Sequence, residues 1–181
     1  MRLFVAAELT DEMVEALVET QAGLRDTVHG RYVAPDSLHV TLAFLGEVNH
    51  SRVGELTDVL YEATAATEPI EAMLGTLGSF GRRSSAIVWQ GFQEGAEELK
   101  QVAARVRSAL DDHGFAFDRK GFLPHITLMR RADLSCASLG MAHVAAGTID
   151  TVTLFSSDLP GDRPRYEAIE RIRLGAPERD W

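Results

Sequence analysis

The stretch that decides the fold is "SLHVTLAFLGEV" at residues 37–48, and its counterpart is "FLPHITLMRRADL" at residues 122–134. Both contain His-x-Thr-Leu inside an apolar run, beginning at His39 and at His125. Short apolar runs bounded by turn signals indicate buried strands. Because side chains alternate along a strand, each histidine shares one face with the threonine two residues later, and the apolar neighbours share the other. The sequence therefore predicts two core strands that each present an imidazole and a hydroxyl on one face.

The segments around these strands mix helices and strands without a regular βαβ alternation, which favours an α+β fold. We expect residues 1–181 to form a single domain with two lobes. The order strand, helix, His-strand, helix in the first half loosely recurs in the second, which suggests a duplicated unit. Thr10 is the expected N-cap of the first helix. The expected helices are 10–28, 50–67 and 95–114, and the expected strands are 2–9, 37–46, 70–81, 85–92, 124–130, 147–159 and 165–174.

Composition limits the classes of function. The chain is 45% hydrophobic and carries a formal net charge of −9, which argues against gripping long duplex DNA or RNA but allows a small phosphate pocket lined by a few arginines. The single cysteine, Cys136, excludes an internal disulfide and a cysteine-based zinc site, and fits a reducing cytoplasm. No run approaches the ~18 apolar residues of a membrane span, so we expect no membrane contact, and an acidic monomer.

Two histidines and two threonines around one cleft would suit acid–base chemistry on a phosphodiester. Imidazole titrates near neutrality, so one of His39 and His125 can act as a base while the other acts as an acid. The hydroxyls of Thr41 and Thr127 can donate to phosphate oxygens where negative charge builds in the transition state. Arg130 follows the second motif and can offer a fork of donors to an anion.

Two plainer interpretations compete with this one. A single His-x-Thr on a strand is usually a partly buried histidine with a satisfied hydrogen bond, and it is the repetition that weakens this explanation. Two histidines without a third ligand in either motif fall short of a zinc or iron set, so no metal or cofactor is expected. A serine-nucleophile elbow, a P-loop and a dinucleotide-binding glycine fingerprint are absent from the sequence.

These residues resemble those of the two-histidine phosphoesterase superfamily, and within it the LigT-like RNA 2′,3′-cyclic phosphodiesterases, also called 2′-5′ RNA ligases. The similarity runs over nearly the whole chain and rests above all on the two His-x-Thr motifs at this separation. It includes "RLFVAAEL", "LHVTLAFLGEV", "LGSFGRRSSAIVWQGF", "PHITLMR" and "LFSSDL...RYEAI".

The resemblance implies a two-lobed, pseudo-symmetric fold in which each lobe is an antiparallel sheet with flanking helices, with the active-site groove between the lobes. It also implies hydrolysis of a terminal RNA 2′,3′-cyclic phosphate to a 2′-phosphate without a metal. His39 would donate a proton to the leaving 3′-oxygen, His125 would activate water, and Thr41 and Thr127 would hold phosphate oxygens. Arg130 would bind phosphate.

Two aromatic residues are further candidates for substrate binding. Tyr32 stands where relatives often carry tryptophan, and it can stack on a base or simply pack. Phe44 follows the first motif, although strand alternation places it on the face opposite His39 and favours a core role. A basic rim that steers the RNA is a further hypothesis, formed by Arg82, Arg83, Arg119 and Lys120.

Other functions remain open at this stage. The substrate could be a small cyclic nucleotide in place of an RNA end, which a shallow groove without stacking aromatics would favour. The chain could also be a non-catalytic RNA- or nucleotide-binding module, although both motifs are intact. Physiological 2′-5′ ligation would use the same site in reverse. The sequence does not decide which histidine is the acid, which RNA is the substrate, or what the oligomeric state is.

Overall fold

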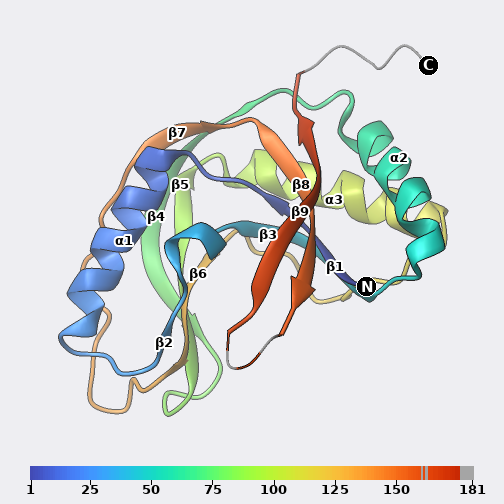
Figure 1. Cartoon of the computed structure of the whole chain (residues 1–181). Coiled ribbons are helices and arrows are strands. Elements are labelled where there is room, and N and C mark those ends of the chain that lie inside the picture. The colour runs from blue at the N-terminus through green and yellow to red at the C-terminus, as the bar shows by residue number, and fades with distance from the viewer. Residues whose placement is uncertain (160, 162, 176–181) are drawn as a thin grey trace.

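The computed structural model describes residues 1–159, 161 and 163–175. Three α-helices and nine strands are assigned within these residues (Figure 1). The helices are α1 (Asp11–Arg25), α2 (Val53–Thr64) and α3 (Ala96–Asp112). The strands are β1 (Arg2–Ala7), β2 (Arg31–Tyr32), β3 (Val40–Glu47), β4 (Ile70–Phe80), β5 (Ala86–Glu94), β6 (Ile126–Ala132), β7 (Ala146–Ile149), β8 (Thr151–Asp158) and β9 (Arg165–Arg173).

The strands form two antiparallel sheets, one for each lobe. The first sheet has the order β3-β1-β8-β9 and the second has the order β2-β6-β5-β4-β7. One histidine motif begins β3 of the first sheet, and the other begins β6 of the second sheet. The first sheet thus combines strands from both ends of the chain. The predicted α+β, two-lobed fold is confirmed.

The helices cover the outer faces of the two sheets. α1 packs against the second sheet, whereas α2 and α3 pack against each other and cover the first sheet (Figure 1). The predicted cap of α1 is present, since the Thr10 side chain accepts a hydrogen bond from the Met13 amide at 3.2 Å. Met13, Leu17 and Leu24 then recur on the buried face of α1. No helix in the described part of the chain is long and apolar enough to cross a membrane.

The single strand expected over 147–159 is wrong, because the chain changes sheets at Asp150. β7 pairs with β4 in the second sheet, and β8 pairs with β1 in the first. The change of sheet is fixed around Asp150, whose carbonyl accepts from the Leu174 amide at 2.7 Å and whose carboxylate pairs with Arg173 at 3.2 Å. Neither glycine nor proline marks this position, so the β pattern of the sequence runs through it.

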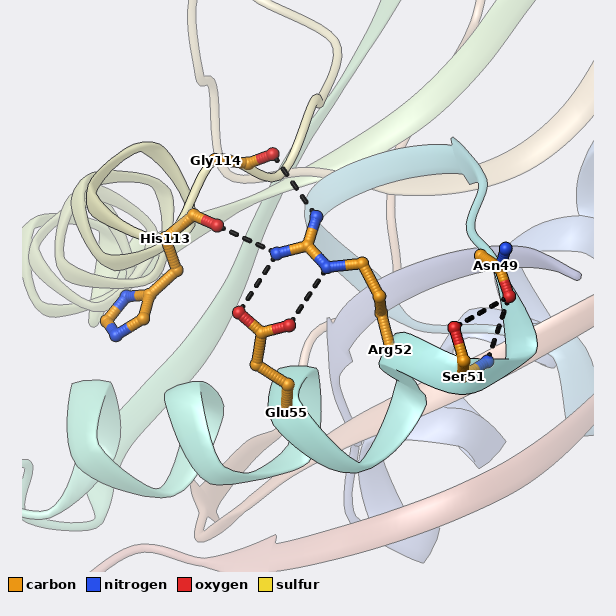
Figure 2. A network of polar contacts seen from close by, with 6 residues as sticks. All are labelled: Asn49, Ser51, Arg52, Glu55, His113 and Gly114. Atoms are coloured by element: carbon orange, nitrogen blue, oxygen red, sulfur yellow. Dashed lines mark hydrogen bonds and ion pairs between the residues drawn. The ribbon is translucent and has the colours of Figure 1, made fainter.

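An arginine joins the start of α2 to the end of α3 (Figure 2). Arg52 donates to both carboxylate oxygens of Glu55 at 2.9 Å and to the His113 carbonyl at 2.9 Å. Its guanidinium also lies 3.9 Å from the centre of the Phe115 ring. Arg52 belongs to a 3-10 turn, His50–Arg52, that Asn49 caps by accepting from the Ser51 amide. The expected helix over 50–67 is therefore a 3-10 turn followed by α2. The arginine satisfies carbonyls that the end of α3 leaves without a helical partner.

Candidate active site

Each motif histidine lies immediately before its strand, not within it as the pattern predicts. The Nδ1 atom of His39 lies 2.7 Å from the Ser37 carbonyl oxygen, and that of His125 lies 2.6 Å from the Leu123 carbonyl oxygen. A carbonyl only accepts, so Nδ1 carries the proton in both rings and Nε2 is left to act on a substrate. The backbone thereby sets the tautomer of both histidines in the same way.

Both motif strands contain a β-bulge directly after the threonine. Between the pairs Ala6↔Thr41 and Val5↔Ala43, β3 has one extra residue, and between Trp89↔Thr127 and Val88↔Met129, β6 has one extra residue. A bulge puts two consecutive residues on the core side and returns the next one to the opposite face. Matching bulges at matching positions support the idea of a duplicated unit.

The bulges decide which face the fifth residue after each histidine occupies. Arg130 returns to the face of Thr127 and lines the groove between the lobes. Phe44 likewise lies across from Phe4, whose ring packs on His39, so the prediction from strand alternation is wrong for Phe44. The Phe44 ring is half-buried against Arg2, with the guanidinium 5.1 Å from its centre, and Phe44 does not line the groove. Its role in substrate binding stays a prediction.

A buried glutamine of α1 holds the second bulge. The Gln21 side chain is 1% exposed, and its Nε2 donates to the Leu128 carbonyl at 2.9 Å and to the Val33 carbonyl at 2.9 Å. The Leu128 carbonyl also accepts from the Val33 amide at 2.9 Å. Leu128 is the extra residue between Thr127 and the rest of β6, so Gln21 fixes the backbone on which Thr127 and Arg130 are mounted.

The groove between the lobes has a volume of about 910 Å³ and brings together six of the seven predicted residues. His39, Thr41, His125, Thr127, Arg130 and Tyr32 all line it. The remaining described lining residues are Arg25, Gly30, Arg31, Val33, Ala34, Pro35, Asp36, Ser37, Arg163, Pro164, Arg165 and Tyr166. Among the described lining residues there are five arginines and one acid. The groove is therefore a cationic region on a chain of net charge −9.

The two histidines differ in their immediate contacts. Nε2 of His39 lies 2.9 Å from the Thr41 hydroxyl oxygen. Burial lowers the pKa of His39 from 6.5 to about 4, against the raising effect of the Ser37 hydrogen bond, and the positive charges of Arg130 and His125 lower it further. With this pKa the His39 ring is neutral at pH 7, and its Nε2 accepts a hydrogen bond from Thr41.

Aromatic rings pack against each histidine. The centre of the His39 ring lies 5.0 Å from that of Phe4 and 5.5 Å from that of Tyr166. The centre of the His125 ring lies 5.2 Å from that of Phe80 and 6.1 Å from that of Trp89. These contacts restrict how each imidazole can turn.

Several residues of the groove were not predicted from the sequence. Tyr166 and Arg165 come from β9, and Arg163 lies just before them in the segment "RPRY". Two arginines and a tyrosine within four residues were the available signal, but only the topology shows that β9 lies in the same sheet as the first motif. Tyr32 was expected to stack or pack. Its hydroxyl donates to the Val28 carbonyl at 2.7 Å, which anchors the ring at the groove wall.

The basic rim is not assembled as predicted. Arg83 donates to the carbonyls of Leu134 and Ala137 at 2.7 and 3.0 Å, and Arg119 pairs with Asp111. Arg82, Arg83, Arg119 and Lys120 are all absent from the groove lining. Within the described residues, no three His, Cys, Asp or Glu side chains are grouped so that they could hold a metal ion.

Two lobes that each bring a His-x-Thr pair to a shared cationic groove define the class of two-histidine phosphoesterases. The sequence profile of the 2′-5′ RNA ligase superfamily matches residues 4–159. The chain belongs to this superfamily, and the resemblance found in the sequence is confirmed.

Curated relatives match over almost all of this chain. The RNA 2′,3′-cyclic phosphodiesterase of Escherichia coli K12 is 31% identical over 96% of both chains. The RNA 2′,3′-cyclic phosphodiesterase of Geobacillus stearothermophilus is 30% identical over 97% of this chain. The matched region spans only 58% of that relative's length.

Solved structures agree with this assignment. The protein TT0787 of Thermus thermophilus superposes with a TM-score of 0.80 at 26% identity, covering 96% of this chain and 98% of that one. E. coli LigT complexed with 3′-AMP superposes with a TM-score of 0.77 at 31% identity, covering 97% and 98%.

Proposed function

We propose that the chain hydrolyses 2′,3′-cyclic phosphate ends of RNA to 2′-phosphates, without a metal, at the groove that holds His39 and His125. The observation that carries this proposal is the placement of both His-x-Thr pairs and Arg130 around one cationic groove. The names of the curated relatives support an enzyme of the RNA 2′,3′-cyclic phosphodiesterase kind. An imidazole pair supplies both proton transfers of the reaction, so the chemistry needs no metal.

The roles of the two histidines follow the family pattern. Water attacks phosphorus while His125 takes its proton, the bond from phosphorus to the 3′-oxygen breaks, and His39 protonates that oxygen. Thr41, Thr127 and Arg130 donate to the other phosphate oxygens, where charge accumulates. In the ligation direction the two histidines would exchange roles.

The pKa of His39 places a condition on this assignment. With a pKa of about 4, His39 is not yet a proton donor at pH 7. A cyclic phosphate anion bound beside it favours the imidazolium and raises the pKa. Its Nε2 would then donate to the substrate, and the Thr41 hydroxyl would turn to another acceptor. Substrate binding would therefore create the acid.

The other hypotheses share the same groove. A small cyclic nucleotide would also present a cyclic phosphate to His39 and His125, and physiological ligation would use the reverse reaction. A purely binding module would retain the phosphate contacts without turnover. We expect the protein to act as a monomer in the cytoplasm, as the composition predicts.

The test is an incubation in excess EDTA with a short RNA that ends in a 2′,3′-cyclic phosphate. The end group is then resolved by phosphatase treatment and chromatography. A 2′-phosphate is the expected product, and a 3′-phosphate would reverse the cleaved bond. A tight complex without turnover would point to the binding module. A nucleoside 2′,3′-cyclic phosphate at the same concentration separates the RNA substrate from the small one.

A further inference from the structure

A side chain of α3 contacts the bulge that follows the first motif threonine. Leu42 is the extra residue between Thr41 and Ala43 in the pairing of β3 with β1. A bulged residue is displaced from the ladder of the sheet, so its buried backbone groups need partners elsewhere. Leu42 is fully buried, and its carbonyl accepts a hydrogen bond from Nε of Arg107 at 3.1 Å. Arg107 therefore holds the backbone on which Thr41 is mounted.

The same guanidinium reaches the segment that leads into the second motif. A second nitrogen of Arg107 donates to the Lys120 carbonyl at 2.8 Å. The guanidinium also lies 5.7 Å and 5.6 Å from the ring centres of Phe117 and Phe122. These three residues belong to the connection from α3 to β6, which ends at His125. A planar, charged group that donates in two directions and packs on two rings fixes this connection against β3.

Gln21 of α1 makes the equivalent connection in the opposite direction. Its Nε2 donates to the Leu128 carbonyl in the second bulge and to the Val33 carbonyl. Val33 lies in the segment that precedes His39. In both cases one helix side chain joins the bulge of one motif to the segment before the histidine of the other motif. Gln21 and Arg107 thus link the two motifs crosswise.

We propose that Arg107 is a positioning residue for the reaction, and that it sets how the His39 half of the groove faces His125. This inference rests on the proposed function, because the two proton transfers occur at the attacking and leaving oxygens of one phosphorus. Arg107 does not line the groove, so it acts through the carbonyls of Leu42 and Lys120. Without it the two halves could shift relative to each other, and a displacement of about 1 Å can cost about 100-fold in rate.

The loss should appear in kcat and not in KM. Arg130, the expected charged contact to the phosphate, is mounted on β6, whose bulge is held by Gln21. Binding of the substrate in the ground state therefore survives the loss of Arg107. Proton transfer to the leaving oxygen and from water needs both histidines in place together, so the transition state is affected most.

The experiment compares Arg107→Met with Arg105→Met on a cyclic-ended RNA, at a temperature at which the variants are folded. Arg105 is the matched control, because it lies on the same helix and donates to the Thr67 hydroxyl at 3.0 Å, away from both motifs. Arg107→Met should lower kcat by about 10- to 100-fold and change KM by less than about 3-fold. Arg107→Lys keeps the charge but cannot reach both carbonyls, so its kcat should lie between those of Arg107→Met and wild type. Arg105→Met should change neither constant.

A second measurement does not need turnover. The ring NMR signals of His39 and His125 in the ligand-free protein should both move in Arg107→Met and stay in place in Arg105→Met. Wild-type kcat in a folded Arg107→Met, or in Arg107→Lys where the methionine variant does not fold, would overturn the positioning role. Unmoved histidine signals would overturn it too. If wild-type protein does not hydrolyse the RNA, the proposed function fails separately, and the NMR comparison alone decides on Arg107.

Discussion

The two halves of the groove have the same backbone geometry around their histidines but different side chains on it. In both halves a carbonyl two residues back accepts from Nδ1 of the histidine, and a bulge follows the threonine. The fifth residue after the histidine is Phe44 in the first half and Arg130 in the second. His39 is held by Thr41 and has a pKa lowered to about 4, whereas the contacts of His125 include the exposed ring of Phe80.

The backbone geometry around the two histidines is the same in both halves, whereas the neighbouring side chains differ. In both imidazoles a backbone carbonyl holds Nδ1–H, so Nε2 is the atom that faces the substrate. This orientation serves a proton acceptor and, once the ring is protonated, a proton donor. The second half carries Arg130 and the exposed ring of Phe80, whereas the first sheet brings Arg165 of β9 to the groove. The two histidines therefore lie in different surroundings, and we expect the His39 side to respond most strongly to a bound anion.

The largest expected effect comes from removing either histidine. His39→Ala and His125→Ala should each lower kcat by about 10²–10⁴-fold, because each deletes one proton transfer. The double variant should be little worse than the more impaired single variant, since the two residues act in one step. Single-turnover rates on a cyclic-ended RNA measure this, and full activity in either single variant would contradict the acid–base pair.

The next effect separates the equivalent positions Arg130 and Phe44. Arg130→Met should raise KM or lower kcat/KM by about 10- to 100-fold, because a charge-assisted hydrogen bond to phosphate is lost. Phe44→Leu should change kcat/KM by less than about 3-fold, a small loss for a ring that packs on Arg2 outside the groove. Steady-state kinetics of both variants provide the comparison, and equal losses would show that the two positions serve the substrate alike.

Gln21 tests whether the second bulge positions Arg130. Gln21→Leu should lower the free energy of unfolding by about 1–3 kcal/mol, because the Val33 carbonyl loses the Gln21 donor and the Leu128 carbonyl keeps only the Val33 amide. The variant should also raise KM. Thr20→Val is the matched control, since Thr20 is equally buried on α1 but hydrogen-bonds to His143, away from the motif strand. Denaturant unfolding and kinetics at a temperature where both variants are folded separate the effects. A Gln21→Leu variant with normal KM would make the contact purely structural.

The smallest expected effect is on the titration of His39. By NMR its ring should titrate near pH 4 in the free protein, and inorganic phosphate should move the pKa upward. Because the unfolded chain takes up this proton near pH 6.5, the free energy of unfolding should fall as pH drops from about 6.5 to about 4. A His39→Gln variant should lose that part of the pH dependence. An unshifted pKa for His39 in the free protein would contradict the burial of this ring.

Much of the fold and of the site could be predicted because the apolar pattern of each motif segment indicates a strand from local sequence alone. The strand patterns and the Thr10 cap depend on local sequence, and the His-x-Thr pairs identified His39 and His125 directly. The bulges were not visible, because "HVTLAF" and "HITLMR" read as regular strands and the extra residue appears only in pairing. The same limit hid the change of sheet at Asp150. That residues 1–181 form a single domain stays a prediction.

The remaining groove residues come together only through topology. Gln21 reads as one more polar residue of a surface helix, and nothing local indicates that it is 1% exposed. Arg165 and Tyr166 reach the groove because β9 joins the sheet that contains the first motif. The positions of these residues depend on long-range contacts between segments, which leave no local signal in the sequence.

The most direct test of the division of labour is a change of leaving group. In a 2′,3′-cyclic phosphate whose 3′-oxygen is replaced by sulfur, the 3′-thiolate can leave without a proton. On this substrate His39→Ala should regain most of the activity that it loses on the oxygen substrate, and His125→Ala should not, because water must still be deprotonated. Recovery by His125→Ala instead, or by neither variant, would contradict the assignment of His39 as the acid.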